Sequence, residues 1–353
     1  MEEQPQSPLG QLKTKRIVLP VLFSLAVAGY MIYKEYDAEK IKALSHQGVA
    51  WGFIFFCFLA MLMRDFAYIW RMKLLSGDKL TWRSAFDITL LWEFSNTVAP
   101  SLTGGTPLMI YMLIKEKVNA GKSTAIIFLT IFLDQFFFVV LAPIMLLILG
   151  EEVLFRPLTG TIGTSVITTM IFTYVILAAY GGLLAFGLFL NPKAVRRFLI
   201  WLFHTRLLRR WAETGEKTGN DLVYASDEFK KYGTVYWLKV VASTIIAWSA
   251  RFMVLNILLM MFSPTMIPFS THLLAWGRQS VLFILMFVAF TPGGSGLAEF
   301  SFMQIMSDLC PDPPGSGMIA FLWRIISFYP YMLLGIWLLP RWIKRVFGSG
   351  NIE

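Results

Sequence analysis

Six charged side chains lie inside long apolar segments of this sequence, where a lipid bilayer would surround them. They are three carboxylates and three arginines: Glu93, Asp134, Glu299, Arg251, Arg278 and Arg324. A charge at bilayer depth is costly and usually functional. A planar guanidinium suits paired hydrogen bonds to a phosphate, so the arginines could bind an anionic group. The carboxylates could orient those arginines or carry a coupling proton.

Buried ion pairs are the alternative interpretation of the same six residues. Such pairs would hold helices together without any contact to a substrate. Both interpretations stay open for Arg278, Arg324 and Glu299, whereas Asp134 is slightly more typical of a structural role. Arg64 and Asp65 lie near the end of their apolar segment and are expected at the membrane interface.

Two breaks interrupt the apolar segments. The first reads APSLTGG, residues 99–105, and the second reads TPGGSG, residues 291–296. Proline ends a helix and glycine permits a tight reversal, so each break predicts a turn between two half-helices. The turn residues are Pro100, Gly104, Gly105, Pro292, Gly293, Gly294 and Gly296. A kink between packed helices is the alternative for either break taken alone.

Irregular backbone at membrane depth is tolerated where it is buried in protein or lines a watery cavity. The N–H groups at the start of each second half-helix would face such a cavity and favour an anion there. We therefore expect a hydrated cavity between the two breaks. Its substrate-binding groups would be the six charged residues together with the polar residues Asn96, Thr103 and Ser295.

Apolar segments of membrane-spanning length carry these residues. The chain has 353 residues, of which 56% are hydrophobic, against about 45–50% in soluble domains. A spanning helix needs about 20 apolar residues, and the clear candidates are residues 17–33, 49–70, 123–149, 162–190, 237–262 and 318–340. The fold class is therefore an all-α polytopic membrane protein, and the long runs exclude a β-barrel. Residues 26–28 mimic a signal-peptidase site, but the apolar run continues past them, so a retained first helix is expected.

Lysine and arginine mark the cytoplasmic loops of a membrane protein, so their distribution predicts the topology. Basic residues on both sides of segment 84–114 predict a re-entrant hairpin from the cytoplasm: Arg71, Lys73, Lys79 and Arg83 in the preceding loop, and Lys115, Lys117 and Lys122 after it. Flanks without Lys or Arg around segment 271–307 predict a second hairpin from the exterior. The same rule predicts three cytoplasmic regions, namely the tails 1–16 and 341–353 and the amphipathic segment 191–236. The result is one transmembrane domain, 17–340, with six spans, two opposed hairpins and an inverted repeat. The lysines of loop 34–46 are inconsistent with its expected exterior position. Opposed broken helices in matching positions point to a midplane transport site.

Catalytic and metal-binding motifs are absent from the sequence. It contains no HExxH, GxSxG, CxxC or Walker-type motif, and its glycine pairs do not follow strands as a dinucleotide site requires. Cys57 and Cys310 suggest neither a metal site nor a disulfide framework. No cofactor, metal or nucleic acid is expected, and the protein is not expected to be an enzyme. A membrane-embedded transferase that uses Glu or Asp as a base stays open.

Three stretches of the sequence resemble one known family. Residues 96–113, NTVAPSLTGGTPLMIYML, resemble the P-x-x-x-G-G-x-P-x-x-x-Y-x-L signature of the lysylphosphatidylglycerol-synthase-type transmembrane family, also called flippase-like proteins. Residues 291–299, TPGGSGLAE, resemble its second signature, and residues 321–330, FLWRIISFYP, followed by Gly335, resemble its last span. The family positions carried over are Pro100, Gly104, Gly105, Pro107, Tyr111, Pro292, Gly293, Gly294, Glu299 and Arg324. The chain departs from the family before Asp134, where Thr130 and Ile131 precede the carboxylate and many members have a Glu-Arg pair.

The resemblance implies movement of lipids or lipid-linked molecules between leaflets. We therefore expect a translocator of an anionic lipid in the cytoplasmic (inner) membrane of a prokaryote, with the headgroup in the hydrated cavity and the acyl chains in the bilayer. Bifunctional family members carry a soluble aminoacyl-transfer domain after the membrane part. The chain ends soon after Pro340, so that synthase activity is not expected. A secondary transporter of a small water-soluble anion is the alternative, and a homo-oligomer is left open.

Overall fold

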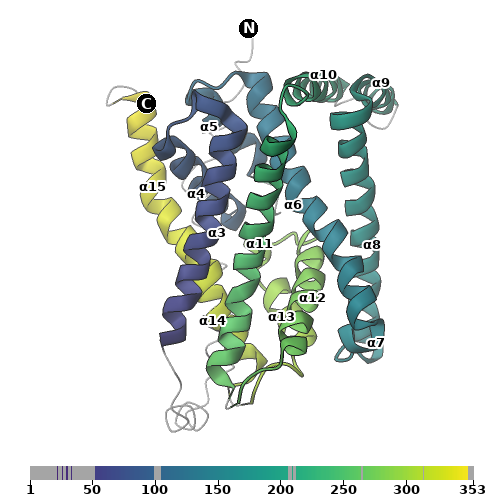
Figure 1. Ribbon diagram of the computed structural model, residues 1–353, viewed down its shortest axis with the longest axis vertical. Helices are drawn as coiled ribbons and strands as arrows, with labels where there is room; N and C mark the ends of the chain where they lie inside the picture. Colours follow the sequence, from purple (N-terminus) through teal and green to yellow (C-terminus); the bar gives the residue numbers. More distant parts are fainter. Residues whose placement is uncertain are drawn as a thin grey trace.

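The protein is helical throughout the part of the chain that its computed structural model describes (Figure 1). The structure describes residues 52–98, 105–205, 212–263, 265–312 and 314–348, together with the isolated positions 22, 26, 29, 30, 33 and 209. The α-helices are α3 (Gly52–Ser76), α4 (Trp82–Val98), α5 (Thr106–Lys115), α6 (Ala120–Leu149), α7 (Glu151–Leu154), α8 (Gly160–Ala185), α9 (Pro192–Phe203), α10 (Ala212–Phe229), α11 (Thr234–Phe262), α12 (Phe269–Met286), α13 (Leu297–Ile305), α14 (Ser316–Ser327) and α15 (Tyr329–Phe347).

Five helical segments are long and apolar enough to cross a membrane. They are α3, α6, α8 with its π-helical continuation Phe186–Leu190, α11, and α14 joined to α15. These segments coincide with five of the six predicted spans and confirm a multi-pass helical membrane protein. The remaining predicted span, 17–33, lies outside the described residues apart from a few isolated helical positions.

Local signals fix several helix ends. Helix α6 begins after Asn119, whose side chain accepts a hydrogen bond of 2.9 Å from the Gly121 N–H. It ends at Gly150, whose φ of 76° lies in the left-handed region that favours glycine. The predicted span 318–340 is not one continuous helix, because α14 ends at Ser327 and α15 begins at Tyr329. Pro330 in the first turn of α15 has no N–H to continue the preceding helix.

The two broken segments each contain a pair of shorter helices. Helices α4 and α5 flank the first break, of which residues 99–104, including the predicted turn residues Pro100 and Gly104, lie outside the described part of the chain. Helices α12 and α13 flank the second break, where Gly293, Gly294 and Gly296 have positive φ. In Figure 1, α4 and α5 lie in the upper half and α12 and α13 in the lower half. Their depth and orientation in a bilayer, and with them the opposed hairpins, the inverted repeat and the topology, stay predictions.

The second break lies against the end of α4. A Cβ added at Gly293 would come within 2.2 Å of the Phe328 ring and 3.1 Å of the Thr97 carbonyl oxygen. Gly293 also has a φ of 56°, which L side chains rarely adopt. This position therefore requires glycine for both its conformation and its packing. The contact joins the second break to α4 and to the junction of α14 and α15.

Helices α9 and α10 lie across the upper end of the bundle in Figure 1. They occupy the predicted amphipathic segment 191–236, and Arg196 of α9 donates a hydrogen bond of 2.6 Å to Asn220 of α10. The outer surface of α9 exposes Phe198 and Trp201. Aromatic side chains among basic residues are typical of a helix in the headgroup region, so a position on the inner leaflet stays a prediction for α9.

A second glycine fixes the packing of α15 on α4. A Cβ at Gly335 would lie only 2.0 Å from the Phe94 ring, and Phe94 is 1% exposed. The ring therefore sits directly on the α15 backbone. Because Phe94 follows Glu93 in α4, this contact also holds the polar part of α4 in place.

We expect Gly335→Val to lower the thermal unfolding midpoint of the purified protein in detergent by several degrees. Overpacking a close contact costs about 1–3 kcal/mol. The matched control is Gly182→Val on α8, where nothing lies within 4 Å of an added Cβ. Equal midpoints for the two variants would contradict the proposed role of the Gly335–Phe94 contact.

Candidate functional site

A polar cavity of about 120 Å³ lies inside the bundle, bounded by α3, α4, α6, α11, α12, α14, α15 and the second break. This volume has room for several water molecules or one compact polar group. The structure brings several predicted site residues to its wall: Glu93, Asn96, Asp134, Arg251, Arg324 and Gly293. A charged cluster inside a bundle of membrane-spanning helices marks this cavity as the candidate site.

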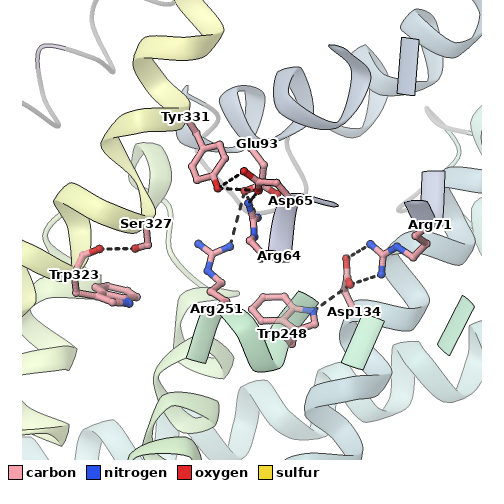
Figure 2. A network of polar contacts seen from close by, with 10 residues as sticks. All are labelled: Arg64, Asp65, Arg71, Glu93, Asp134, Trp248, Arg251, Trp323, Ser327 and Tyr331. Atoms are coloured by element: carbon pink, nitrogen blue, oxygen red, sulfur yellow. Dashed lines mark hydrogen bonds and ion pairs between the residues drawn. The ribbon is translucent and has the colours of Figure 1, made fainter. Parts of the chain in front are cut away.

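Arg64 occupies the centre of the charged cluster (Figure 2). Its side chain is 0% exposed, and its Nη atoms lie 2.7 Å from Asp65 and 2.5 Å from Glu93. The rings of Tyr68 and Tyr331 lie 4.8 and 4.9 Å from its guanidinium carbon, and the Tyr331 hydroxyl donates to Asp65 at 2.8 Å. The structure thus places Arg64 in the protein interior, and its depth in the bilayer stays a prediction. Helix α3 continues to Ser76, well past the predicted end of that span, and carries Arg64 into the protein interior.

Asp134 is paired with Arg71, as Figure 2 shows. The guanidinium makes two hydrogen bonds to the carboxylate, of 2.7 and 3.0 Å, and a third of 2.8 Å to Thr244. The Trp248 indole also donates to Asp134 at 3.1 Å. The sequence counted Arg71 among the loop charges, but the structure buries it within α3. Arg71 thus supplies the positive partner of Asp134 in a chain whose sequence departs from the family's Glu-Arg pair.

Arg324 and Glu299 form a second buried pair, at the second break. Their contact is 2.6 Å, and both side chains are 4% exposed. The other Glu299 oxygen accepts from the Gly296 N–H at 2.6 Å, which caps the start of α13. Arg324 also donates to the Gly293 carbonyl at 3.2 Å. This pair therefore fixes the backbone of the second break, and Arg324 lines the cavity as well.

Arg278 does not line the cavity. It is 0% exposed and pairs with Asp308 in the segment that follows α13. It also donates to the backbone carbonyls of Val153, Leu154 and Ile305 at 3.0 to 3.1 Å. A guanidinium has five N–H donors, and these contacts use them. Arg278 therefore ties α12 to α7 and to the end of α13.

Arg251 differs from the other interior arginines because no described carboxylate lies close to it, and its side chain is 16% exposed. Its closest carboxylate contact is 3.9 Å, to Glu93, and its buried Nε has no hydrogen-bond partner among the described residues. The faces of Trp248 and Phe283 lie 5.6 and 5.1 Å from its guanidinium carbon. The buried Nε and Nη2 atoms of Arg64 also lack a hydrogen-bond partner among the described residues, but Arg64 does not line the cavity. Arg251 thus offers the cavity a fixed positive charge with unused hydrogen-bonding capacity.

Further polar atoms of the cavity wall share this property. The Thr89 and Thr130 hydroxyls and the Gln135 carbonyl oxygen are buried and lack a hydrogen-bond partner among the described residues. All three residues line the same cavity as Arg251. Buried polar groups are normally hydrogen-bonded, so their convergence on one cavity suits a polar ligand or water.

Further predicted residues lie away from this cavity or outside the described chain. Glu299 pairs with Arg324 but is not part of the cavity wall. Pro100, Thr103 and Gly104 fall within residues 99–104, which the structure does not describe. Ser295 is 2% exposed and is not part of the cavity wall.

The remaining turn residues of the first break lie on α5 and just before it. Gly105 precedes α5 and faces Ser95, which an added Cβ would approach to 2.6 Å. Pro107, in the first turn of α5, lines a neighbouring groove. Tyr111 lies with its ring 5.3 Å from the Lys115 ammonium nitrogen.

Arg64, Asp65, Arg71 and Tyr331 are the cluster residues that the sequence did not assign to the site. A signal for part of this set was present, because Arg64, Tyr68 and Arg71 are spaced i, i+4, i+7 and so share one face of α3. Membrane-embedded polar residues face the interior of a bundle. That spacing places the three residues toward the interior rather than in a loop.

Comparison with known proteins agrees with this architecture. The model of the lysylphosphatidylglycerol synthase TM region family matches residues 17–335. A UPF0104 membrane protein from Archaeoglobus fulgidus is 25% identical over 332 residues, which cover 90% of this chain and 94% of the relative. No solved structure matches the chain. The family match takes in both breaks and the whole charged cluster, and the chain therefore belongs to the lysylphosphatidylglycerol synthase TM region family.

Proposed function

We propose that the protein binds the anionic headgroup of a membrane lipid in the polar cavity and moves the lipid between leaflets. The observation that carries this proposal is Arg251, a partly buried arginine of the cavity wall whose buried Nε has no hydrogen-bond partner in the described part of the chain. An anionic group would complete its hydrogen bonds and balance its charge. Family membership supports a role at the membrane, and the name of the matched family refers to a phospholipid.

The other charged residues would keep the cavity in shape. Arg71 and Asp134 neutralise each other, as do Arg324 and Glu299. Glu93 contacts both Arg64 and Arg251, so it would hold Arg251 in position until a ligand arrives. An incoming phosphate would then share Arg251 with this carboxylate.

The two breaks supply the irregular backbone that such a path requires. In the proposed arrangement, α4–α5 and α12–α13 enter the bilayer from opposite sides and meet where Gly293 contacts Thr97. The headgroup would pass between them in the cytoplasmic membrane of a prokaryote. A transporter of a small soluble anion would use the same Arg251, so the lipid is the part of the proposal that needs its own test.

The first test compares Arg251→Gln with Arg278→Gln. We expect Arg251→Gln to weaken binding of dioctanoyl phosphatidylglycerol at least about tenfold, because a hydrogen bond to a charged group contributes about 1.5–3 kcal/mol. Its unfolding midpoint should stay near that of the wild type. Arg278→Gln should lower the midpoint, because it leaves Asp308 without its buried partner.

The measurement is native mass spectrometry with added lipid, paired with thermal unfolding in detergent. Dioctanoyl phosphatidylcholine, which has no net charge, is the control lipid. Unchanged phosphatidylglycerol binding by a folded Arg251→Gln variant would refute the assignment of the anion site to Arg251.

The second test asks whether the cavity admits water. We expect Thr130→Cys, in the cavity wall, to react in membranes with a charged water-soluble methanethiosulfonate much faster than Ser280→Cys. Ser280 is 0% exposed, lies outside the cavity wall and donates to its own helix at the Gly277 carbonyl.

Both cysteine variants are made in a background without Cys57 and Cys310. Burial raises the pKa of the Cys310 thiol to about 12, so at neutral pH it holds almost no reactive thiolate. Its removal should leave the labelling of Thr130→Cys unchanged. Equal, negligible labelling at both introduced cysteines would exclude a hydrated cavity.

A further inference from the structure

A groove of about 550 Å³ adjoins the polar cavity. It lies among α5, α6, α8 and the segment that follows α12. Three residues, Ile131, Gln135 and Phe287, line both the cavity and the groove. The two spaces therefore share a wall.

The groove has a different chemical character from the cavity. Its described lining includes no charged residue and consists mainly of apolar side chains such as Phe128 and Leu177. The Thr173 hydroxyl donates to the Thr169 carbonyl of its own helix at 2.8 Å, which leaves no free donor on that side chain. Such a lining suits a hydrocarbon and does not suit an ion or a soluble headgroup.

The groove opens toward the outer surface of α8. Thr173 and Leu177 are 2% and 5% exposed and form its floor, whereas Ile176 and Tyr180 are 47% and 40% exposed and form its rim. Helix α8 belongs to a segment apolar enough to span a membrane. In a bilayer, the open side of the groove would therefore face lipid.

We infer that this groove is an acyl-chain site. A phospholipid whose headgroup occupies the cavity at Arg251 lays one chain in the groove, between α6 and α8, and the shared residues Gln135 and Phe287 mark the point where headgroup and chain separate. The substrate is then a chain-bearing amphiphile rather than a free anion. This inference rests on the proposed function, because it takes Arg251 as the headgroup ligand.

The physical role of such a groove is orientation rather than affinity. Lipid tails are as apolar as leucine, so moving a chain from bilayer to groove gains little hydrophobic free energy. A groove next to the cavity instead fixes where the chain leaves the protein. A lipid can then present its headgroup to Arg251 while its chain stays out of water.

The test is photo-cross-linking with the whole protein in nanodiscs of phosphatidylcholine. The probe is a trace of phosphatidylglycerol with a diazirine in the middle of one chain, and the cross-linked residues are mapped by peptide mass spectrometry. We expect cross-links at groove residues such as Phe128, Thr173 and Tyr180 that excess unlabelled phosphatidylglycerol abolishes. Cross-links at the exposed α8 residues Phe172 and Val175 should persist, because bulk lipid surrounds those side chains.

A matched pair of variants tests the site sterically. Ile176→Trp fills the groove from its rim, where folding is least affected, and should abolish the competed cross-links. Val175→Trp adds the same ring at the neighbouring residue, which is 57% exposed and is not part of the groove wall, and should leave them intact. Groove cross-links that are absent, or that unlabelled lipid does not reduce, would overturn the inference.

A soluble probe separates this inference from the proposed function. Glycerol 3-phosphate carries the anionic group without a chain. If Arg251→Gln weakens its binding while the groove never cross-links, the acyl-chain site is refuted and the anion site stands. If the groove shows competed cross-links in Arg251→Gln as in the wild type, the acyl-chain site stands and Arg251 is refuted as headgroup ligand.

Discussion

The buried guanidinium of Arg64 is the interaction on which the polar interior depends. One side chain of α3 meets carboxylates on α3 and α4 and lies between aromatic rings from α3 and α15. Removing one partner of a buried ion pair costs about 3–5 kcal/mol. Arg64 therefore joins α3, α4 and α15, although its buried Nε and Nη2 atoms have no hydrogen-bond partner among the described residues. The cavity beside it keeps its shape for the same reason.

The pairing of the charges explains how Arg251 differs from the other interior arginines of the described chain. Arg71 is paired with Asp134, Arg278 with Asp308, and Arg324 with Glu299. Glu93 is shared between Arg64, at 2.5 Å, and Arg251, at 3.9 Å. The shorter distance means that Glu93 interacts more strongly with Arg64 than with Arg251. Arg251 thus keeps a positive charge that the described carboxylates neutralise only in part.

Much of the helical architecture was predictable from the sequence, because a run of about 20 apolar residues has few alternatives to a spanning helix. Proline and glycine likewise marked the second break, where the glycines adopt positive φ. The interruption at Phe328 was missed although Pro330 follows it, because a proline does not always end a helix. Pro143, for example, lies inside the continuous helix α6.

The roles of the charges could not be predicted in the same way. Sequence shows that a charge is present but not which groups meet it, so Arg278 and Arg251 looked alike. Their difference comes from carbonyls at Val153, Leu154 and Ile305, which only the tertiary structure brings to Arg278. Arg71 was misplaced because the charge rule treats lysine and arginine as loop markers. Its partner Asp134 is distant in the sequence, and no local pattern connects the two.

The interruption of the last span at Phe328 has a mechanical consequence. Arg324 and Tyr331 are seven residues apart and would share one face of a continuous helix. With the helix broken between them, Arg324 holds the second break through Glu299, while Tyr331 reaches Asp65 in the Arg64 cluster. The two polar clusters thus contact different helices, α14 and α15, which are separated by the break at Phe328. Each cluster can therefore set the direction of its own helix, an independence that a single straight helix would not allow.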